Sequence, residues 1–600
     1  MKIIWSLFIL QTLLLSSSYL AASKLSLQIL DTDFFELLHA LRAHRLHQPI
    51  NFLFLGGIGL KHYKRVANML LYFWTRQHLR AYLLFMLYVT FILLYLEIIP
   101  SDYLYRCCIF PFLAAAITLW PYLFAQATIK NPTTFQEDAY NFSLLGKEGQ
   151  YLPVSHPQTG ILIAGTPGCG KTKCLIEPIL FKMIQKGYAG IVYDYDFAAS
   201  PAGPAYSLTH LAYHCYRHFT HKHCRFFSVN LQDLHTTSRI NPIAPDYIQD
   251  RKKLSHGLHT FLLNLNPQIG QKEDFWYKNT YALLKGVIVL LANRYPQYCT
   301  LPHAILLGLQ PHKRLMAALQ TDPEASLYAS PVLDAFKQAP EQFAGVIANF
   351  KVSLERLLDQ HVFWVLSGHD VPTTINDKEN PVILCLGNTP KEKEVISPIL
   401  SMIIAVLIGN MYGHASNKSF LMIDELPTLF LPHLSEIPAT ARKYNIATVV
   451  ALQNMAQLER TYTPIGAKEI QETFSNHFIG RGQLRLSKAL SDMLGKKEIA
   501  KSSKTTHAQD QTSETVHQQE ALVITPQEAM TLQTGEFIGK VVHQSGGFFK
   551  MALEPIKAYH KKLSYKHFQP LPTIHQQVDV AANFARIQEE VEEIAKQCMP

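Results

Sequence analysis

Apolar residues are concentrated before residue 128, and the rest of the 600-residue chain alternates shorter apolar runs with polar stretches. The last two N-terminal runs are each about the ~20 residues that an α-helix needs to cross a bilayer. The first run is also long enough, although it resembles a cleaved signal peptide, and the second run is short. The candidate spans are residues 3–22, 50–60, 81–99 and 107–125.

After residue 140, short apolar runs alternate with helical periodicities, which is the pattern of a parallel sheet covered on both faces. Between residues 247 and 370 the strand pattern stops and only helical periodicities remain. We therefore predict an α/β domain over residues 140–245 and 376–570, with an all-α insertion domain over residues 246–375. The predicted strands are residues 160–164, 189–197, 224–231, 239–243, 381–390, 419–425 and 445–453.

The stretch GTPGCGKT fits the phosphate-binding pattern GxxxxGK[ST], between a predicted strand and a predicted helix over residues 174–187. In that setting backbone N–H groups close around phosphate oxygens at a helix N-terminus, where the helix dipole favours anions. Lys171 would reach the β- and γ-phosphates, and the Thr172 hydroxyl would bind Mg²⁺. A structural turn is the alternative, which the flanking strand and helix disfavour. The loop residues are Gly165, Thr166, Pro167, Gly168, Cys169, Gly170, Lys171 and Thr172.

The positions of charged residues indicate how the apolar runs cross the membrane. Residues 61–80 carry five Lys and Arg residues and no acid, a bias typical of the cytoplasmic side. A nucleotide-dependent domain must also meet cytoplasmic ATP, so the last two spans form a hairpin with residues 100–106 outside. Lys2 inside then requires one further crossing, which the short run at 50–60 supplies. We predict a membrane domain over residues 1–128 with about four transmembrane helices, and three spans are the alternative.

Two later strands end in polar residues that suit nucleotide chemistry. One carries Asp424-Glu425 after its apolar residues, the arrangement of a Walker B motif. The aspartate would hold Mg²⁺, usually through water, and the glutamate would polarise the attacking water. An acidic pair can end any buried strand, but a phosphate-binding loop in the same domain favours the catalytic interpretation. The next strand ends at Gln453, which is either a γ-phosphate sensor at the ligand-binding edge of the sheet or a plain surface glutamine.

Two C-terminal segments are predicted from their polarity. Residues 501–519 hold almost no apolar residue and predict a mobile loop. Residues 575–597 predict an amphipathic helix within a C-terminal segment over residues 571–600. This helix packs back on its own domain by default, and docking to a partner is the alternative. Its apolar face is formed by Val580, Phe584, Ile587, Val591 and Ile594.

Composition changes this picture little. The net charge of +9 counts only weakly toward a nucleic-acid partner. The nine cysteines show no disulfide framework, as expected for a cytosolic body. The stretch HCYRHFTHKHC at residues 214–224 holds two cysteines and four histidines but lacks the second half of a zinc site. A helix end with a polar loop is therefore favoured over a metal site.

The order of these features resembles a type IV coupling protein of the TraG kind, most closely the mobilisation protein C branch of conjugative elements. Membrane runs come first, followed by the Walker A loop, a helical insertion, the Walker B pair and the glutamine-ended strand. The resemblance covers residues 140–560, and the ordered set is specific although many ATPases share the Walker motifs. The matching stretches are GTPGCGKT, Tyr193-Asp194, INPI, TLPHAI, FWVLSG, ILCLGNTP, IDELPTL, ATARKYNIA, LQNMAQL and GEFIG.

The resemblance implies a RecA-like motor that forms a ring, a homo-hexamer, in the bacterial inner membrane with its ATPase domain in the cytoplasm. It implies ATP and Mg²⁺ as cofactors, with single-stranded DNA, its relaxase and relaxosome, and the type IV secretion channel as partners. Catalytic roles carry over to Lys171, Glu425 and Gln453. Arg442, eighteen residues after Asp424, matches the arginine finger that reaches a neighbouring subunit's γ-phosphate, and a solvated helix-end arginine is its alternative. The helical insertion would meet the DNA or the relaxase.

The sequence departs from the family at one position of the loop, and two other functions are the alternatives to a coupling protein. Cys169 occupies a position where the family commonly has serine, so we expect function to survive with added sensitivity to oxidation. A segregation-type translocase of double-stranded DNA usually ends in a winged-helix DNA reader, which the residues after 560 do not resemble. A non-hydrolysing nucleotide-binding membrane scaffold has no need of the intact Glu425.

Overall fold

The computed structural model describes residues 137–197, 207–220, 224–266, 275–412, 416–506, 512–542 and 548–598. These residues lie in one structural unit, Gln136–Pro600. The predicted membrane spans fall outside the described residues. Among the residues described, the helix α18 (Lys393–Met411) is long and apolar enough to cross a membrane, but 78% of it is buried inside the protein, as in a core helix.

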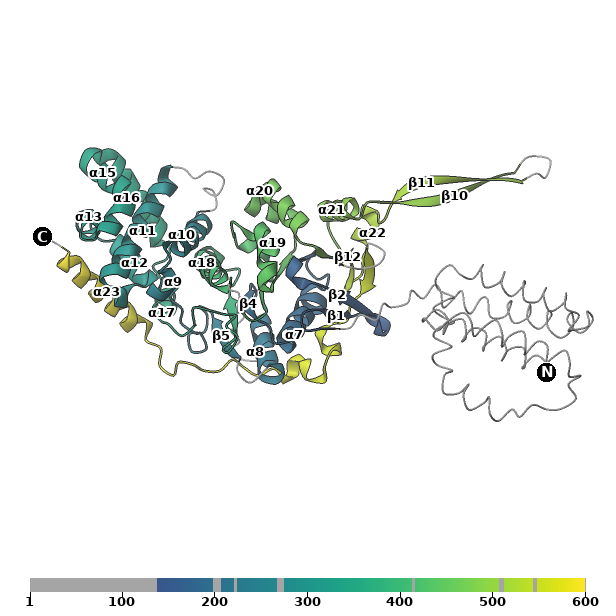
Figure 1. Cartoon of the computed structure of the whole chain (residues 1–600), viewed down its shortest axis with the longest axis horizontal. Coiled ribbons are helices and arrows are strands. Elements are labelled where there is room, and N and C mark those ends of the chain that lie inside the picture. Colours follow the sequence, from purple (N-terminus) through teal and green to yellow (C-terminus); the bar gives the residue numbers. More distant parts are fainter. Residues whose placement is uncertain are drawn as a thin grey trace, which may run out of the picture. The chain divides into compact units, whose positions relative to one another are not determined.

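Nine strands form one sheet in the order β13-β12-β9-β3-β8-β7-β4-β6-β5 (Figure 1). The seven strands from β9 to β5 are parallel, and β12 and β13 continue one edge antiparallel. The α/β prediction is confirmed, with a mixed and mostly parallel sheet. The strands are β3 (Ile161–Ala164), β4 (Ala189–Asp194), β5 (Arg225–Val229), β6 (Val382–Gly387), β7 (Ser419–Ile423), β8 (Ile446–Leu452), β9 (Asn476–Ile479), β12 (Glu536–Lys540) and β13 (Phe549–Ala552).

The central strands are apolar throughout because alternate side chains enter two different cores. In β7, Phe420 packs into the core formed with α7 (Glu177–Gln185) and α8 (Leu208–Phe219). The next residue, Leu421, packs into the core on the opposite face, which contains α18. Both faces of the sheet are therefore covered, as the continuous apolar runs predicted.

Between β5 and β6 the described elements are helices only. The helix α10 packs along α18, and its apolar residues belong to the same core as one face of the sheet. The helical region is thus joined to the sheet by a continuous core. Its helices are α9 (Pro245–Ile248), α10 (Arg251–Leu265), α11 (Phe275–Arg294), α12 (Leu301–Gly308), α13 (His312–Gln320), α14 (Pro323–Tyr328), α15 (Ser330–Gln338), α16 (Pro340–Glu355) and α17 (Gln360–Leu366).

The C-terminal helix α23 (Val580–Gln597) lies along α12 and α17 (Figure 1). Ile587, Val591 and Ile594 on its apolar face are at most 1% exposed. His303 Nε2 of α12 lies 2.9 Å from an oxygen of Glu590 at the edge of this contact. The helix therefore packs on its own chain, on the helical region rather than on the sheet.

The strand predicted over residues 239–243 is wrong. The backbone N–H of Arg239 donates to Asp370 Oδ2 at 2.8 Å, and that of Ile240 donates to the Val365 carbonyl at 2.8 Å. The backbone of this segment is therefore bonded to α17 and the loop after it, so it does not join the sheet.

The loop predicted over residues 501–519 is also wrong for residues 501–506 and 512–519, and residues 507–511 lie outside the described residues. Strands β10 (Lys496–Thr506) and β11 (Thr512–Leu522) pair antiparallel along their whole length and form a sheet of their own (Figure 1). Cross-strand pairing satisfies the inward-pointing half of the ribbon's backbone groups and leaves the outward-pointing half to water, so the pairing requires no apolar pattern. The alternation that identifies a half-buried strand is therefore missing from its sequence.

The packing of α23 predicts the effect of Ile587→Ala. Deleting buried methyl groups in a core costs about 2–5 kcal/mol, so amide exchange should accelerate in α12 and α17. Hydrogen exchange read by mass spectrometry on the full chain measures this, with exposed Glu589→Ala as the matched control. Unchanged protection of α12 and α17, or an equal loss in β3, would contradict a local role for α23.

Candidate nucleotide-binding site

The loop between β3 and the following helix has the backbone of a phosphate-binding loop. Gly168 and Gly170 have φ of 76° and 100°, in the left-handed region that favours glycine. The helix begins with one π-helical turn, Thr172–Ile176, and continues as α7. The predicted loop from Gly165 to Thr172 therefore lies between a strand and a helix N-terminus, where backbone N–H groups favour phosphate.

Cys169 packs beneath this loop and is 0% exposed. A Cβ added at Gly480, just after β9, would lie 3.1 Å from the Cys169 sulfur. The thiol is therefore enclosed between the loop and the end of β9. The expected sensitivity of the loop to oxidation is wrong, because the folded protein shields this sulfur from solution.

Lys171 is buried at the base of the loop. Its Nζ donates to the Gly165 carbonyl at 2.7 Å and to the Thr166 carbonyl at 3.3 Å. The same ammonium lies close enough to Asp424 and Glu425 that its charge lowers the pKa of both carboxyl groups, against the effect of their burial. The lysine therefore joins the loop electrostatically to the acidic pair.

Asp424 and Glu425 follow β7 at the same edge of the sheet. Burial raises the pKa of Asp424 to about 8, and the charges of Asp194 and Glu425 act in the same direction. Burial raises the pKa of Glu425 to about 7, opposed by Lys171 and by hydrogen bonds from Gln453. The Oε1 atom of Glu425 is buried without a hydrogen-bond partner among the described residues. Crowded, buried carboxylates of this kind suit a divalent cation.

Gln453 lies between the loop and the acidic pair because of the strand order. It directly follows β8, and β8 pairs with β3 on one side and with β7 on the other. Hydrogen bonding from its backbone and its side chain lowers the pKa of Glu425, against the effect of burial. Lys171, Asp424, Glu425 and Gln453 are thus brought together by the fold.

Asp194 belongs to the same acidic group, although the sequence did not assign it a role. It ends β4, which pairs with β7, and it is 1% exposed. Its Oδ2 accepts hydrogen bonds from the backbone N–H of Thr209 at 2.9 Å and from the Thr209 hydroxyl at 2.7 Å. The signal in the sequence was the acidic residue at the end of an apolar strand, as in Asp424.

Arg442 is not part of this group within one chain. It is exposed and begins the short turn Arg442–Tyr444, just before β8. The seven residues of β8 separate its two ends by roughly 23 Å, and Gln453 lies at the other end. Arg442 therefore lies at the edge of the sheet opposite to the phosphate-binding loop.

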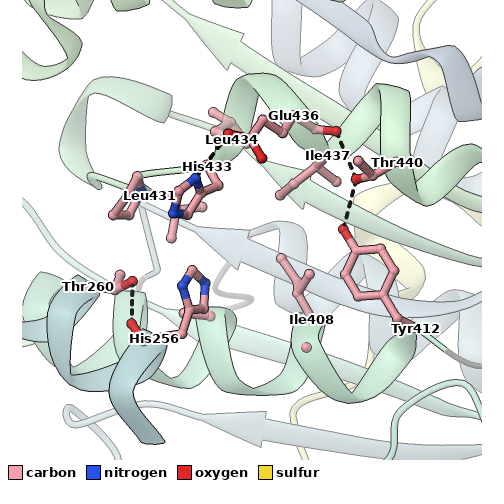
Figure 2. Close-up of a pocket in the computed structure, with 13 residues that line it drawn as sticks. His256, Thr260, Ile408, Tyr412, Leu431, His433, Leu434, Glu436, Ile437 and Thr440 are labelled. Carbon is pink, nitrogen blue, oxygen red and sulfur yellow. Dashed lines mark hydrogen bonds and ion pairs between the residues drawn. The ribbon is translucent and has the colours of Figure 1, made fainter. Parts of the chain in front are cut away.

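A separate hollow of about 200 Å³ lies between α10, α18 and the segment after the Walker B strand (Figure 2). The rings of His256 and His433 face each other across it with centroids 5.5 Å apart, and His433 Nδ1 lies 3.1 Å from Glu436 Oε1. Across the described part of the chain, no group of three or more His, Cys, Asp or Glu residues could hold a metal ion by itself. The hollow shares no residue with the loop or the acidic pair and is distinct from the nucleotide site.

Comparisons with known proteins agree with this geometry. A family model described as type IV secretory system conjugative DNA transfer matches residues 125–558. Solved structures with a similar fold include the unbound bacterial conjugative coupling protein TrwBdeltaN70, with a TM-score of 0.54 and 16% identity over 70% of this chain and 89% of that chain. The plasmid coupling protein TrwB in complex with ADP and Mg²⁺ has a TM-score of 0.52 and 15% identity, over 73% of this chain and 92% of that chain. These identities establish a likeness of fold alone. No curated protein sequence matches the chain significantly.

The acidic pair predicts that Asp424→Asn stabilises the nucleotide-free, Mg²⁺-free protein, and more so at high pH. The pKa of Asp424 rises from 3.8 to about 8 on folding, so its contribution to stability is present below pH 3.8 and is lost as pH rises through about 8. Thermal unfolding of the full chain with EDTA should show a gain of roughly 2–4 °C at pH 8.5 and less at pH 5. Exposed Asp492→Asn is the control. An equal shift at both pH values would contradict the buried-charge argument.

Proposed function

The chain belongs to the family of type IV secretion proteins for conjugative DNA transfer, and we propose that it couples ATP hydrolysis to the export of a single DNA strand. It is a conjugative coupling protein of type IV secretion, from a membrane-associated family, and it binds nucleotide. The proposed activity rests on one observation: four polar residues lie close together at one edge of the sheet, namely Lys171, Asp424, Glu425 and Gln453. Such a set binds a nucleoside triphosphate and directs water at its last phosphate.

The loop from Gly165 to Thr172 holds the phosphate chain. Its backbone N–H groups surround the phosphate oxygens, and Lys171 exchanges the carbonyls of Gly165 and Thr166 for the β- and γ-phosphates. The Thr172 hydroxyl and the Asp424 carboxylate, the latter through water, would hold Mg²⁺, which would neutralise phosphate charge. Few protein ligands are needed because Mg²⁺ in such sites takes most of its ligands from phosphate and water. TrwB is known in complex with ADP and Mg²⁺, which supports this assignment.

Glu425 is the general base. It accepts a proton from the water that attacks the γ-phosphorus, as the bond to the β–γ bridging oxygen breaks. Burial brings the pKa of this carboxyl to about 7, close to the operating pH, where a general base works best. Hydrogen bonding from Gln453 orients Glu425. If Gln453 moves when the γ-phosphate binds or leaves, the position of the general base changes with it.

Arg442 completes the site of a neighbouring subunit. The length of β8 keeps it from its own loop, so its guanidinium acts only in an assembly where this edge of one subunit meets the loop edge of the next. A closed ring of identical subunits, a homo-hexamer, provides that contact at every interface.

The remaining domains adapt this motor to conjugation. The RecA-like motor comprises residues 140–245 and 376–570, with ATP and Mg²⁺ as cofactors, and the all-α insertion comprises residues 246–375. Residues 1–128 form the multi-pass domain in the bacterial inner membrane, and residues 571–600 the C-terminal helix. The insertion receives the single-stranded DNA with its relaxase from the relaxosome, and the membrane domain adjoins the secretion channel.

The activity is tested by the ATPase rate of the full chain in lipid nanodiscs. We expect single-stranded DNA to increase the rate several-fold, because the motor turns over when it engages its substrate. Lys171→Ala is the control, and it should lose turnover at every DNA concentration. A preference for duplex DNA would favour the segregation-type translocase instead. No turnover under any condition would favour the non-hydrolysing scaffold.

The role of Arg442 is tested by mixing two inactive variants. Arg442→Ala should bind ATP nearly normally but hydrolyse it slowly, since an arginine finger contributes about 10³–10⁵ in rate. Glu425→Gln should stall for lack of its base. Mixed rings contain interfaces with an intact Glu425 on one side and an intact Arg442 on the other, so mixing should restore part of the ATPase rate. Exposed Lys443→Ala is the matched control. No recovery despite demonstrated co-assembly would show that Arg442 does not act between subunits.

A further inference from the structure

The strand order indicates where the nucleoside end of the nucleotide lies. The γ-phosphate end faces Asp424 and Glu425, which follow β7 on one side of the loop strand β3. The α-phosphate and the nucleoside therefore extend away from β7. On that side the next strand is β9, which pairs with β3 in parallel. The residues directly after β9 are thus the first that the nucleoside end would meet.

The segment after β9 is tied closely to the phosphate-binding loop. The backbone N–H and the hydroxyl of Thr166 both donate to the Arg481 carbonyl, at 2.8 Å and 3.0 Å. The backbone N–H of Gly480 donates to the Ala164 carbonyl at 2.9 Å. Two different points of this segment are therefore held against the start of the loop, which fixes Arg481 beside it.

A second segment holds the loop from the same side. The backbone N–H of Gly535 donates to the Cys169 carbonyl at 2.9 Å, and the Thr534 hydroxyl donates to the Gly168 carbonyl at 3.2 Å. These residues precede β12, the strand beyond β9. The loop is thus supported on the β9 side by two segments and faces the acidic pair on the other.

Arg481 offers a cation on the β9 side. It lies between Gly480 and Gly482, where an added Cβ would come within 3.0 Å of Phe537 and 3.1 Å of Leu486. Close packing therefore leaves Arg481 as the single side chain of this three-residue stretch, and it is exposed. The nearby Arg485 pairs with Glu459 at 2.9 Å, whereas no carboxylate of the described residues pairs with Arg481.

We propose that Arg481 binds the α-phosphate of the nucleotide and thereby directs the nucleoside over the segment between β9 and α21 (Leu484–Leu494). An arginine guanidinium presents several N–H donors in a planar arrangement that matches phosphate oxygens. The assignment rests on the proposed function, because it places a bound nucleoside phosphate in the loop. It adds a second cation to the site, from the opposite side to the acidic pair.

The test is isothermal titration calorimetry of the full chain in detergent with Mg²⁺ and ADP, GDP or a non-hydrolysable ATP analogue. Arg481→Ala should weaken all three by the same factor, about tenfold, because all three carry an α-phosphate. Arg481→Lys should recover part of the loss by restoring the charge. Arg485→Ala, which removes an arginine already paired with Glu459, should leave all three affinities unchanged.

The outcomes separate this inference from the proposed function. Unchanged affinities in Arg481→Ala, with wild-type binding intact, would overturn the α-phosphate contact and leave the proposed function standing. A loss confined to the ATP analogue would place Arg481 at a γ-phosphate. A loss shared by ADP and the ATP analogue but absent for GDP, or one confined to GDP, would make it a base contact, so each of these results would overturn it. No binding of any nucleotide by the wild-type chain would overturn the proposed function itself.

Discussion

The burial of three carboxyl groups at one edge of the parallel sheet, which opposes their negative charge, is the constraint on which the nucleotide site depends. Asp194, Asp424 and Glu425 end neighbouring strands or follow them, and burial raises the pKa of each. Lys171 partly offsets this charge, and Thr209 and Gln453 offset it by hydrogen bonds. Because these carboxylates are kept out of water, a ligand that binds together with a divalent cation stabilises the site most.

The parallel sheet is what concentrates these groups. In a parallel sheet all carboxyl ends of the strands lie at the same edge, so residues far apart in sequence meet there. Because β8 lies between β3 and β7, Gln453 is placed between the loop and Glu425. The helical region enters between β5 and β6, at the far end of the sheet from β3, so it leaves this arrangement undisturbed.

The two sides of the phosphate-binding loop differ in chemistry. The β8 side carries carboxylates and a glutamine, which suit metal binding and the activation of water. The β9 side carries Arg481, whose carbonyl accepts hydrogen bonds from Thr166. A cation there suits a phosphate that is bound but takes no part in the reaction. Arg442 lies at the opposite edge of the sheet, a strand's length from both. A single chain therefore holds a binding site, and the transition-state cation proposed for it belongs to another subunit.

Local patterns in the sequence determined the phosphate-binding loop, the acidic pair, six strands of the main sheet and the apolar face of α23. Each of these depends on residue type and spacing over a short stretch, such as the glycines with left-handed φ at 168 and 170. The sequence misjudged residues 239–243, because two isoleucines at alternate spacing in a five-residue stretch do not reveal that its backbone bonds to α17. It also misjudged the β10–β11 ribbon, because residues 501–519 hold almost no apolar residue and so lack the alternation by which a half-buried strand is identified. Only the tertiary structure decided that Asp194 joins the acidic group, that Cys169 is enclosed, that Arg481 adjoins the loop and that Arg442 lies across the sheet from it. Those facts follow from strand order and parallel register, which place residues hundreds of positions apart at one edge and which no local pattern encodes.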